Sequence, residues 1–155
     1  MPSRLKENPQ YLKELQAIVA EAPFPRHMAM RLADIAFGRA TIELELSRVH
    51  LQSFGLVHGG VLATLIDTAT FWAVFMALPE DAGLVNVDLK LNYLRPVTEG
   101  TLKAEGRSIR EGKSLCYSEA TVYNQHDAIV AHGTSTLMVL PGKGLPMAAR
   151  KFLVA

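Results

Sequence analysis

The chain has 155 residues, of which 49% are hydrophobic and 20% charged, and these values fit one globular domain with a sizeable core. The formal net charge of +1 at pH 7 gives no overall field that would favour nucleic acid or an anionic membrane as a partner. The single cysteine, Cys116, excludes an internal disulfide and fits a reducing, cytoplasmic compartment. The first ten residues lack the apolar core of a signal peptide, which agrees with that expectation.

The first predicted element is a short amphipathic helix over residues 8–19. Asn8 is suited to cap this helix, and Pro9 is suited to its first helical position. Its apolar side chains recur on one face: Leu12, Leu15 and Val19. Two prolines within residues 22–25 end the helix, because proline cannot continue it. We therefore treat residues 1–26 as an N-terminal helix and lead-in.

Strand patterns dominate the rest of the chain. A hairpin is predicted over residues 30–46, with its turn at Gly38-Arg39. Four further strand-like runs are separated by prolines, glycines or polar turn residues: 84–94, 101–110, 114–124 and 128–140. One face of the first run is expected to be apolar, because four residues alternate there with polar ones: Val85, Val87, Leu89 and Leu91. Consecutive strands joined by short turns imply an antiparallel sheet.

Between the hairpin and these strands lies an apolar run over residues 61–78, in which Asp67 is the only charged side chain. Burying an ionised carboxylate without partners is unfavourable, so a chain that keeps Asp67 there is expected to use it. The run is long enough for a transmembrane helix. The carboxylate, three threonines and the lack of a second such segment argue against that interpretation.

A helix that is apolar almost all round must be buried on most sides. One antiparallel sheet curled around this helix meets that demand. We therefore predict an α+β fold, with the main domain over residues 27–140 and a peripheral tail over residues 141–155.

Gly59 and Gly60 follow His58 at the start of this helix. The first N–H groups of a helix have no partner within it, and the helix dipole adds positive charge there, so this end can stabilise an oxyanion. Asp67 lies eight residues after Gly59, about 12 Å along the helix axis. A reacting carbonyl must lie about 3 Å from both the attacking group and the oxyanion donors. If the site attacks a carbonyl, the spacing predicts an obligatory dimer with two composite sites.

Two motifs carry a family resemblance. They are the pattern Gly55-x-x-His58-Gly59-Gly60-x6-Asp67-x-Ala69 and the run NVDLKLNYLRP over residues 86–96. Together they resemble the hotdog-fold acyl-CoA thioesterases, in particular the phenylacetate-pathway (PaaI-like) subgroup of the thioesterase superfamily. The resemblance covers roughly residues 22–140. It implies a hotdog fold and hydrolysis of an acyl-CoA thioester to a carboxylic acid and free CoA.

The resemblance also implies roles for five residues. Gly59 would donate its backbone N–H to the thioester oxygen, and His58 would orient that turn. Asp67 of the partner chain would act as nucleophile or general base. Asn86 stands where relatives often carry serine or threonine, and would help to position the attacking water. Gln52 stands where the aspartate subgroup usually has asparagine, and is the candidate for a polarising role.

A turn between two strands matches the region that borders the CoA groove in relatives, and it contains Arg110, Gly112, Lys113 and Ser114. Its two cations can meet phosphates, and its glycine leaves room for close approach. The remaining histidines show no ligand spacing and have no cysteine partner, so we expect no metal site. We expect no organic cofactor, because the carboxylate, the helix amides and water suffice. The resemblance implies that the homodimer can pair further into a homotetramer, as relatives commonly do, and the sequence leaves the choice between dimer and tetramer open.

Two other functions are alternatives to thioester hydrolysis. A hotdog hydratase or dehydratase needs a histidine–acid pair, whereas His58 belongs to the backbone turn. A non-catalytic acyl-CoA-binding regulator carries an added DNA-binding domain, for which the three basic and three acidic residues of positions 1–25 are too few and too balanced. The sequence leaves open the acyl group (aryl, hydroxyaryl or medium-chain) and the carrier (CoA or acyl carrier protein). It also leaves open whether attack is direct or passes through a covalent anhydride.

Overall fold

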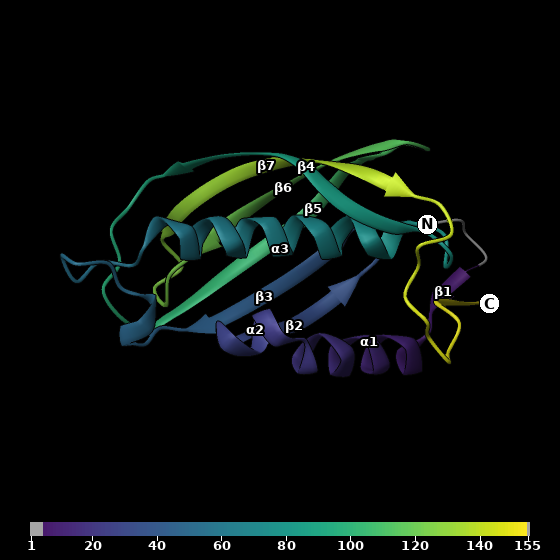
Figure 1. Cartoon of the computed structure of the whole chain (residues 1–155), viewed down its shortest axis with the longest axis horizontal. Coiled ribbons are helices and arrows are strands. Elements are labelled where there is room, and N and C mark those ends of the chain that lie inside the picture. The colour runs from purple at the N-terminus through teal and green to yellow at the C-terminus, as the bar shows by residue number, and fades with distance from the viewer. Residues whose placement is uncertain (1–4, 155) are drawn as a thin grey trace.

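Residues 5–154 are described by a computed structural model, in which an antiparallel sheet curls around one long helix (Figure 1). In chain order the elements are β1 (Leu5–Glu7), α1 (Pro9–Glu21), α2 (Pro23–His27), β2 (Met30–Ala36), β3 (Arg39–Glu45), the 3-10 turn η1 (Arg48–His50), α3 (Gly59–Ala77), β4 (Gly83–Tyr93), β5 (Thr101–Glu111), β6 (Leu115–Tyr123), β7 (Ile129–Leu140) and β8 (Phe152–Val154). The helices and strands predicted from the sequence are all present, with ends that differ by no more than two residues.

The main sheet has the strand order β2-β3-β5-β6-β7-β4, and every neighbouring pair is antiparallel. Its concave face holds α3, while α1 packs against β2 (Figure 1). The predicted α+β hotdog architecture is therefore confirmed. Strand β4, which follows α3 in the chain, lies at one edge of this sheet.

Helix α3 is buried along most of its surface because nearly all of its side chains are apolar. Its buried residues are Val61, Leu62, Leu65, Ile66, Ala69, Thr70, Ala73, Val74, Phe75 and Met76. Gly106 of β5 lets the sheet approach the helix closely, since a Cβ there would lie 2.2 Å from the carbonyl oxygen of Ala69. By length and composition α3 would also pass for a membrane span, but the core helix of a soluble protein meets the same criteria.

A β-bulge in β4 corrects one expectation. The pairing of β4 with β7 shifts between Asn86 and Asp88, and the extra residue reverses which side chains face the core. Val85 and Val87 are therefore 40% and 52% exposed, although the sequence predicted an apolar face that included both. Beyond the bulge, Leu89 packs against the core as predicted. The same shift leaves the Asn86 side chain facing α3.

The N-terminal segment agrees with its predicted caps. The Asn8 side chain accepts a hydrogen bond from the N–H of Gln10 at 3.0 Å, and Pro9 takes the first helical position of α1. The buried face is made by Tyr11 together with Leu15 and Val19, and the predicted Leu12 is only partly buried. The prolines do end α1, but the first of them also starts the short α2, where its missing N–H is tolerated.

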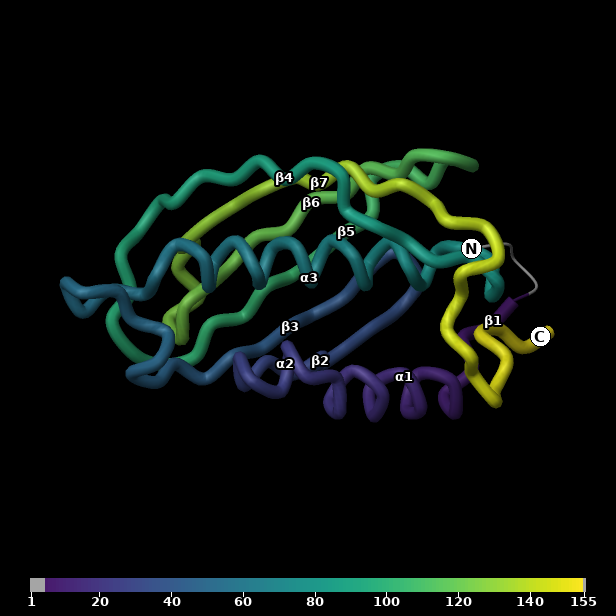
Figure 2. Tube along the Cα trace, viewed as in Figure 1, coloured from purple at the N-terminus to yellow at the C-terminus, as the bar shows by residue number. Residues whose placement is uncertain are grey.

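The C-terminal segment is not peripheral, which is a second correction. Figure 2 shows this segment running back past the end of α3 to β1, and β8 pairs with β1. Lys151 is fully buried, and its Nζ donates to the carbonyl oxygens of Phe75 at 2.8 Å and Leu78 at 3.0 Å. These carbonyls end α3, where the helix dipole favours a cation. The tail therefore completes the C-terminal end of the central helix.

Lys151 predicts a pH dependence of stability. Burial lowers the pKa of its ammonium group from 10.5 to about 8, against the opposing effect of the Glu80 carboxylate. The unfolded chain then binds more protons than the folded chain between these values, so the folded state gains stability as the pH rises from 8 to 10.5. Relative to Lys151→Met, we expect the wild-type free energy of unfolding to rise by about 3 kcal/mol across that window, measured by urea unfolding.

The exposed Lys143 of the same tail provides the matched control. Lys143→Met is expected to keep the wild-type pH dependence, because this change leaves the buried ammonium group of Lys151 in place. Parallel stability curves for wild type and Lys151→Met between pH 8 and pH 10.5 would contradict the prediction.

Candidate functional site

His58 caps the N-terminus of α3 and leaves one amide free. Its Nδ1 accepts from the N–H of Gly60 at 2.8 Å, and its carbonyl oxygen accepts from the N–H of Val61 at 2.9 Å. The N–H of Gly59 has no hydrogen-bond partner within residues 5–154. The first turn of α3 thus presents a single unpaired donor at the positive end of the helix dipole.

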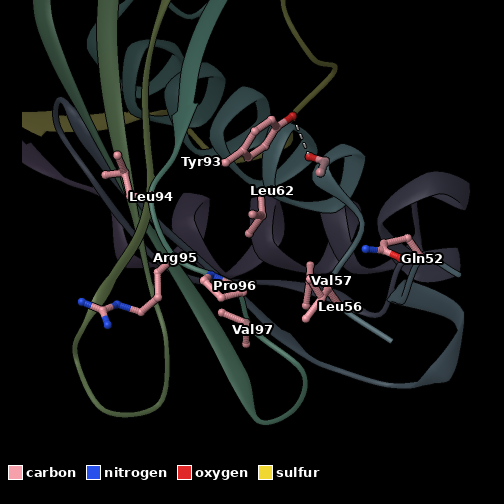
Figure 3. A pocket seen from close by; sticks show the side chains of 10 residues that line it. Gln52, Leu56, Val57, Leu62, Tyr93, Leu94, Arg95, Pro96 and Val97 are labelled. Atoms are coloured by element: carbon pink, nitrogen blue, oxygen red, sulfur yellow. Dashed lines mark hydrogen bonds between the residues drawn. The ribbon is translucent and has the colours of Figure 1, made fainter. Parts of the chain in front are cut away.

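A cavity of about 450 Å³ opens beside this amide. Its walls come from the loop before α3, the first turn of α3 and the end of β4, and they are mostly apolar (Figure 3). The lining residues are Gln52, Leu56, Val57, Gly59, Leu62, Tyr93, Leu94, Arg95, Pro96 and Val97. Two residues that the sequence placed in one site, Gly59 and Gln52, therefore do share a pocket.

Gln52 is held by its own loop. Its main-chain N–H donates to the carbonyl oxygen of Leu56 at 2.8 Å, and its side-chain Oε1 accepts from the N–H of Phe54. Figure 3 shows the side-chain amide nitrogen of Gln52 turned toward the interior of the cavity. This orientation leaves a hydrogen-bond donor facing the pocket, and the polarising role of Gln52 stays a prediction.

Asp67 lies in the middle of α3 and is paired with β4. The Nδ2 of Asn86 donates to Asp67 Oδ1 at 2.5 Å and to the Asp67 carbonyl oxygen at 3.3 Å. Burial raises the pKa of the Asp67 carboxyl above its ordinary value of 3.8, and the hydrogen bond from Asn86 partly offsets that rise. The Oδ1 of Asn86 is buried and has no partner within residues 5–154. The pair thus places a carboxylate that can act as a base next to an amide oxygen, Asn86 Oδ1, that is free to accept a hydrogen bond.

A single chain does not bring the predicted site residues together. Gly59 and Asp67 belong to one continuous helix, so they remain about 12 Å apart along its axis. The turn at residues 110–114 lies at the opposite end of α3, about 27 Å from Gly59 by helical rise. Its Gly112 and Lys113 line a separate cavity of about 350 Å³ with Ala77 and Pro79. In one chain the predicted site residues therefore lie in three separate groups.

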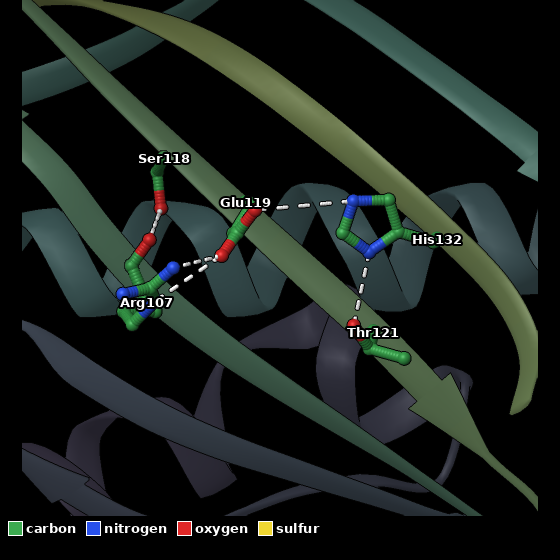
Figure 4. Close-up of polar contacts among 5 residues, drawn as sticks. All are labelled: Arg107, Ser118, Glu119, Thr121 and His132. Atoms are coloured by element: carbon green, nitrogen blue, oxygen red, sulfur yellow. Dashed lines mark hydrogen bonds and ion pairs between the residues drawn. The ribbon is translucent and has the colours of Figure 1, made fainter.

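A further polar cluster lies on the face of the sheet away from α3 (Figure 4). Arg107 donates to Glu119, whose other carboxylate oxygen lies 3.9 Å from His132 Nε2, and His132 Nδ1 meets Thr121 Oγ1 at 2.9 Å. This is a histidine–acid pair, but the sheet separates it from Asp67. It therefore offers no support for the hydratase alternative at the α3 site.

No group of three or more histidine, cysteine, aspartate or glutamate side chains in the described part of the chain could hold a metal ion. Cys116 is buried, and its Sγ donates a hydrogen bond to the carbonyl oxygen of Gly112 at 3.6 Å. Its surroundings match the structural role expected for a small buried side chain.

The profile of the family described as "Thioesterase superfamily" matches residues 54–131, which span α3 and strands β4 to β6. The chain belongs to the thioesterase superfamily. Human acyl-coenzyme A thioesterase 13 is 26% identical over 131 residues, covering 82% of this chain and 93% of the human protein. The resemblance inferred from the two sequence motifs is therefore confirmed.

Solved structures support the fold of this thioesterase-superfamily member. A thioesterase from Haemophilus influenzae has a TM-score of 0.80 at 20% identity, covering 91% of this chain and 98% of the other. The E. coli PaaI protein of the phenylacetic acid degradation operon has a TM-score of 0.79 at 20% identity, covering 88% of this chain and 97% of the PaaI chain. At these identities the two comparisons show the shared fold alone.

The sequence did not single out Tyr93, which the structure places on the site. Its ring stands over Gly59 at the mouth of the cavity, and the dashed line in Figure 3 marks its hydrogen bond to the Gly59 carbonyl oxygen. Tyr93 lies within the second family motif, but nothing in that motif shows which residue of α3 it meets. The contact depends on where β4 ends relative to the start of α3.

The pairing of Asp67 with Asn86 predicts two pKa values that carboxyl ¹³C NMR can measure. The wild-type Asp67 pKa is expected above 3.8, and that of Asn86→Ala higher still, because the hydrogen bond that favours the charged form is lost. Asn92→Ala, an exposed change on the same strand, is expected to leave the Asp67 pKa unchanged. A lower Asp67 pKa in Asn86→Ala than in wild type would show that Asn86 does not stabilise the carboxylate.

Proposed function

We propose that this protein hydrolyses acyl-CoA thioesters to a carboxylic acid and free CoA. The observation that carries the proposal is the presence, on one helix, of an unpaired N–H at Gly59 and a partly buried carboxylate at Asp67. The Gly59 N–H can stabilise the developing oxyanion, and the Asp67 carboxylate can activate the attacking group. Membership of the thioesterase superfamily and the similarity to human acyl-coenzyme A thioesterase 13 support this reaction.

In the proposed mechanism, Asp67 removes a proton from water and the resulting hydroxide adds to the thioester carbonyl. The oxyanion accepts a hydrogen bond from the N–H of Gly59. The C–S bond of the tetrahedral intermediate then breaks, and the CoA thiolate takes up the proton that Asp67 removed from water. Free CoA and the carboxylic acid leave, and Asp67 is again a carboxylate. The unpartnered Oδ1 of Asn86 favours water as the attacking group, because it can accept the second water hydrogen beside Asp67.

The composite site requires two copies of α3 packed antiparallel. Residue 63 lies midway between Gly59 and Asp67, so a pair of helices that crosses there sets each Gly59 opposite the partner's Asp67. Ala63 is small and only partly buried in the single chain, which allows the two helices to approach closely. The other α3 residues that the sheet leaves at least partly uncovered near this point lie on the same face: Gly60, Thr64, Thr68 and Phe71.

The free edge of β4 provides a second contact for the same dimer. Strand β4 ends the sheet order, and an edge strand presents unpaired N–H and C=O groups that can pair with a second copy. Val85 and Val87 on this strand are 40% and 52% exposed. Edge-to-edge pairing would cover them and place two α3 helices side by side on the same face of an extended sheet. Further pairing of such dimers into a homotetramer remains part of the proposal.

The antiparallel dimer also gives a role to the turn at residues 110–114. Within one chain this turn is about 27 Å from Gly59, but the partner's Gly59 would lie only about 15 Å from the Ala77 end of α3 along the axis. Arg110 and Lys113 are exposed and can pair with the phosphates of CoA, while Ser114 adds a hydroxyl. We assign the CoA moiety to this turn and the thioester to the partner's Gly59.

The reaction as proposed needs no metal ion and no organic cofactor, since water, a carboxylate and a backbone amide supply each step. CoA enters as part of the substrate. A cytoplasmic location completes the proposal, supported by the single, buried Cys116.

Asp67→Asn tests the activity itself. The amide keeps the shape of the side chain but cannot take a proton, so we expect release of free thiol to fall at least about 100-fold. The assay measures thiol release across a panel of aryl-, hydroxyaryl- and medium-chain acyl-CoA, with size-exclusion chromatography to show that the oligomer persists. Asp34→Asn, on the far edge strand β2, is the control and is expected to keep full activity. Asp67→Asn that retains most of the activity would overturn the proposal.

Mixed dimers test whether the site is shared between chains. Gly59→Val and Asp67→Asn are each expected to be inactive alone, but a mixed dimer contains one site with both groups intact. Random assembly of equal amounts makes half of the dimers mixed, and each mixed dimer has one intact site and one inactive site. The mixture should therefore show about one quarter of the wild-type activity per chain. The measurement is thiol release after co-expression of two differently tagged chains. Activity no higher than that of the separate variants would place both groups in one chain.

A further inference from the structure

Tyr93 makes two contacts with Gly59 from the end of β4. Its hydroxyl donates to the Gly59 carbonyl oxygen at 3.2 Å. A Cβ added to Gly59 would lie 2.9 Å from the Cζ of Tyr93, so the ring rests directly on the glycine. The same ring lines the cavity of about 450 Å³ beside the free amide. Tyr93 therefore touches the oxyanion turn and the pocket at once (Figure 3).

The peptide between Gly59 and Gly60 is held at both ends. Tyr93 donates to its carbonyl oxygen, and its N–H donates to His58 Nδ1 at 2.8 Å. The main-chain N–H of His58 is itself fixed, since it donates to the carbonyl oxygen of His50 at 2.9 Å. The free N–H of Gly59 lies between these two anchored points. Its direction is set by these contacts together with the bond from the N–H of Val61 to the carbonyl oxygen of His58, and Tyr93 supplies the one contact that comes from a distant strand.

The tyrosine also explains why a glycine stands at position 59. Gly59 is not among the glycines with positive φ, so its backbone conformation would accept an L residue. The atoms that a Cβ would meet belong to the Tyr93 ring. The requirement for glycine therefore comes from the close approach of this ring, and an alanine methyl would have to displace it.

We infer that Tyr93 is a positioning residue for the proposed thioesterase: it fixes the direction of the Gly59 N–H that receives the oxyanion. The inference rests on the proposed function and adds a residue to it. A displaced amide would still allow the substrate to bind, because the cavity walls remain. It would stabilise the transition state less well, because oxyanion hydrogen bonds depend on donor direction.

Tyr93→Phe is the first test, since it removes the hydroxyl and keeps the ring. We expect kcat for thiol release to fall about three- to tenfold, the effect of one neutral hydrogen bond, while KM changes less than about twofold. The melting temperature is expected to stay at the wild-type value. Tyr123→Phe, a change at a half-buried tyrosine whose ring contacts Lys103, is the matched control and should keep wild-type kinetics. An unchanged kcat in Tyr93→Phe, or a loss confined to KM, would overturn the inference.

A double-variant cycle supplies a second test. If the methyl of Gly59→Ala displaces the ring, the hydrogen bond is already broken, so adding Tyr93→Phe should lower kcat no further. Independent effects would instead multiply, and that outcome would show that the hydroxyl does not act through Gly59.

One measurement does not depend on activity. With ¹⁵N-glycine labelling, the amide resonances of Gly59 and Gly60 are expected to shift in Tyr93→Phe, and the amide of Gly60, which donates to His58, is expected to exchange faster with solvent. Unchanged resonances and exchange would refute the contact. Wild type that releases no thiol from any acyl-CoA would refute the proposed function, whereas active wild type with an unaffected Tyr93→Phe would refute this inference alone.

Discussion

The sheet can wrap only part of α3, and the rest of the molecule depends on the strip that it leaves uncovered. A helix this apolar must be buried, and strands β3 to β7 cover most of it. The remaining face carries small residues and the carboxylate of Asp67. This face cannot bring Gly59 and Asp67 together by itself, because helical rise holds them apart. In the proposed enzyme a second copy of the chain packs against this uncovered face of α3 and completes the site.

The carboxylate of Asp67 is tolerated on this helix because a β-bulge in β4 turns the Asn86 side chain toward it. A strand without a bulge would keep one phase, and could not present both Asn86 and Leu89 to the core. With the bulge, the amide of Asn86 reaches Asp67 and apolar packing resumes three residues later, at Leu89. The carboxyl pKa is raised by burial yet restrained by that amide. The raised pKa makes the ionised carboxylate of Asp67 a stronger base than that of an exposed aspartate.

Each end of α3 is held by at least one side chain from a distant part of the chain. At the N-terminus, His58 accepts from the N–H of the peptide between Gly59 and Gly60, and Tyr93 donates to the carbonyl oxygen of the same peptide. The Gly59 N–H stays free. At the C-terminus, Lys151 fills the place of the missing donors. The result is a helix fixed at each end, on which the distance between its amide donor and its base cannot drift. Rigid support of this kind is what a reacting group requires.

The sequence by itself determined the elements, because helical and strand periodicity, caps and turn breakers are local properties of the chain. It also determined the spacing of His58-Gly59-Gly60 and Asp67, and with it the family. Tertiary structure alone decided which groups meet. The contacts of Asn86 with Asp67, of Tyr93 with Gly59 and of Lys151 with Phe75 span 19, 34 and 76 residues. Each depends on strand register, on the bulge in β4 or on the path of the tail, and none of these has a local pattern in the sequence. A one-residue change in register would turn each strand side chain to the opposite face.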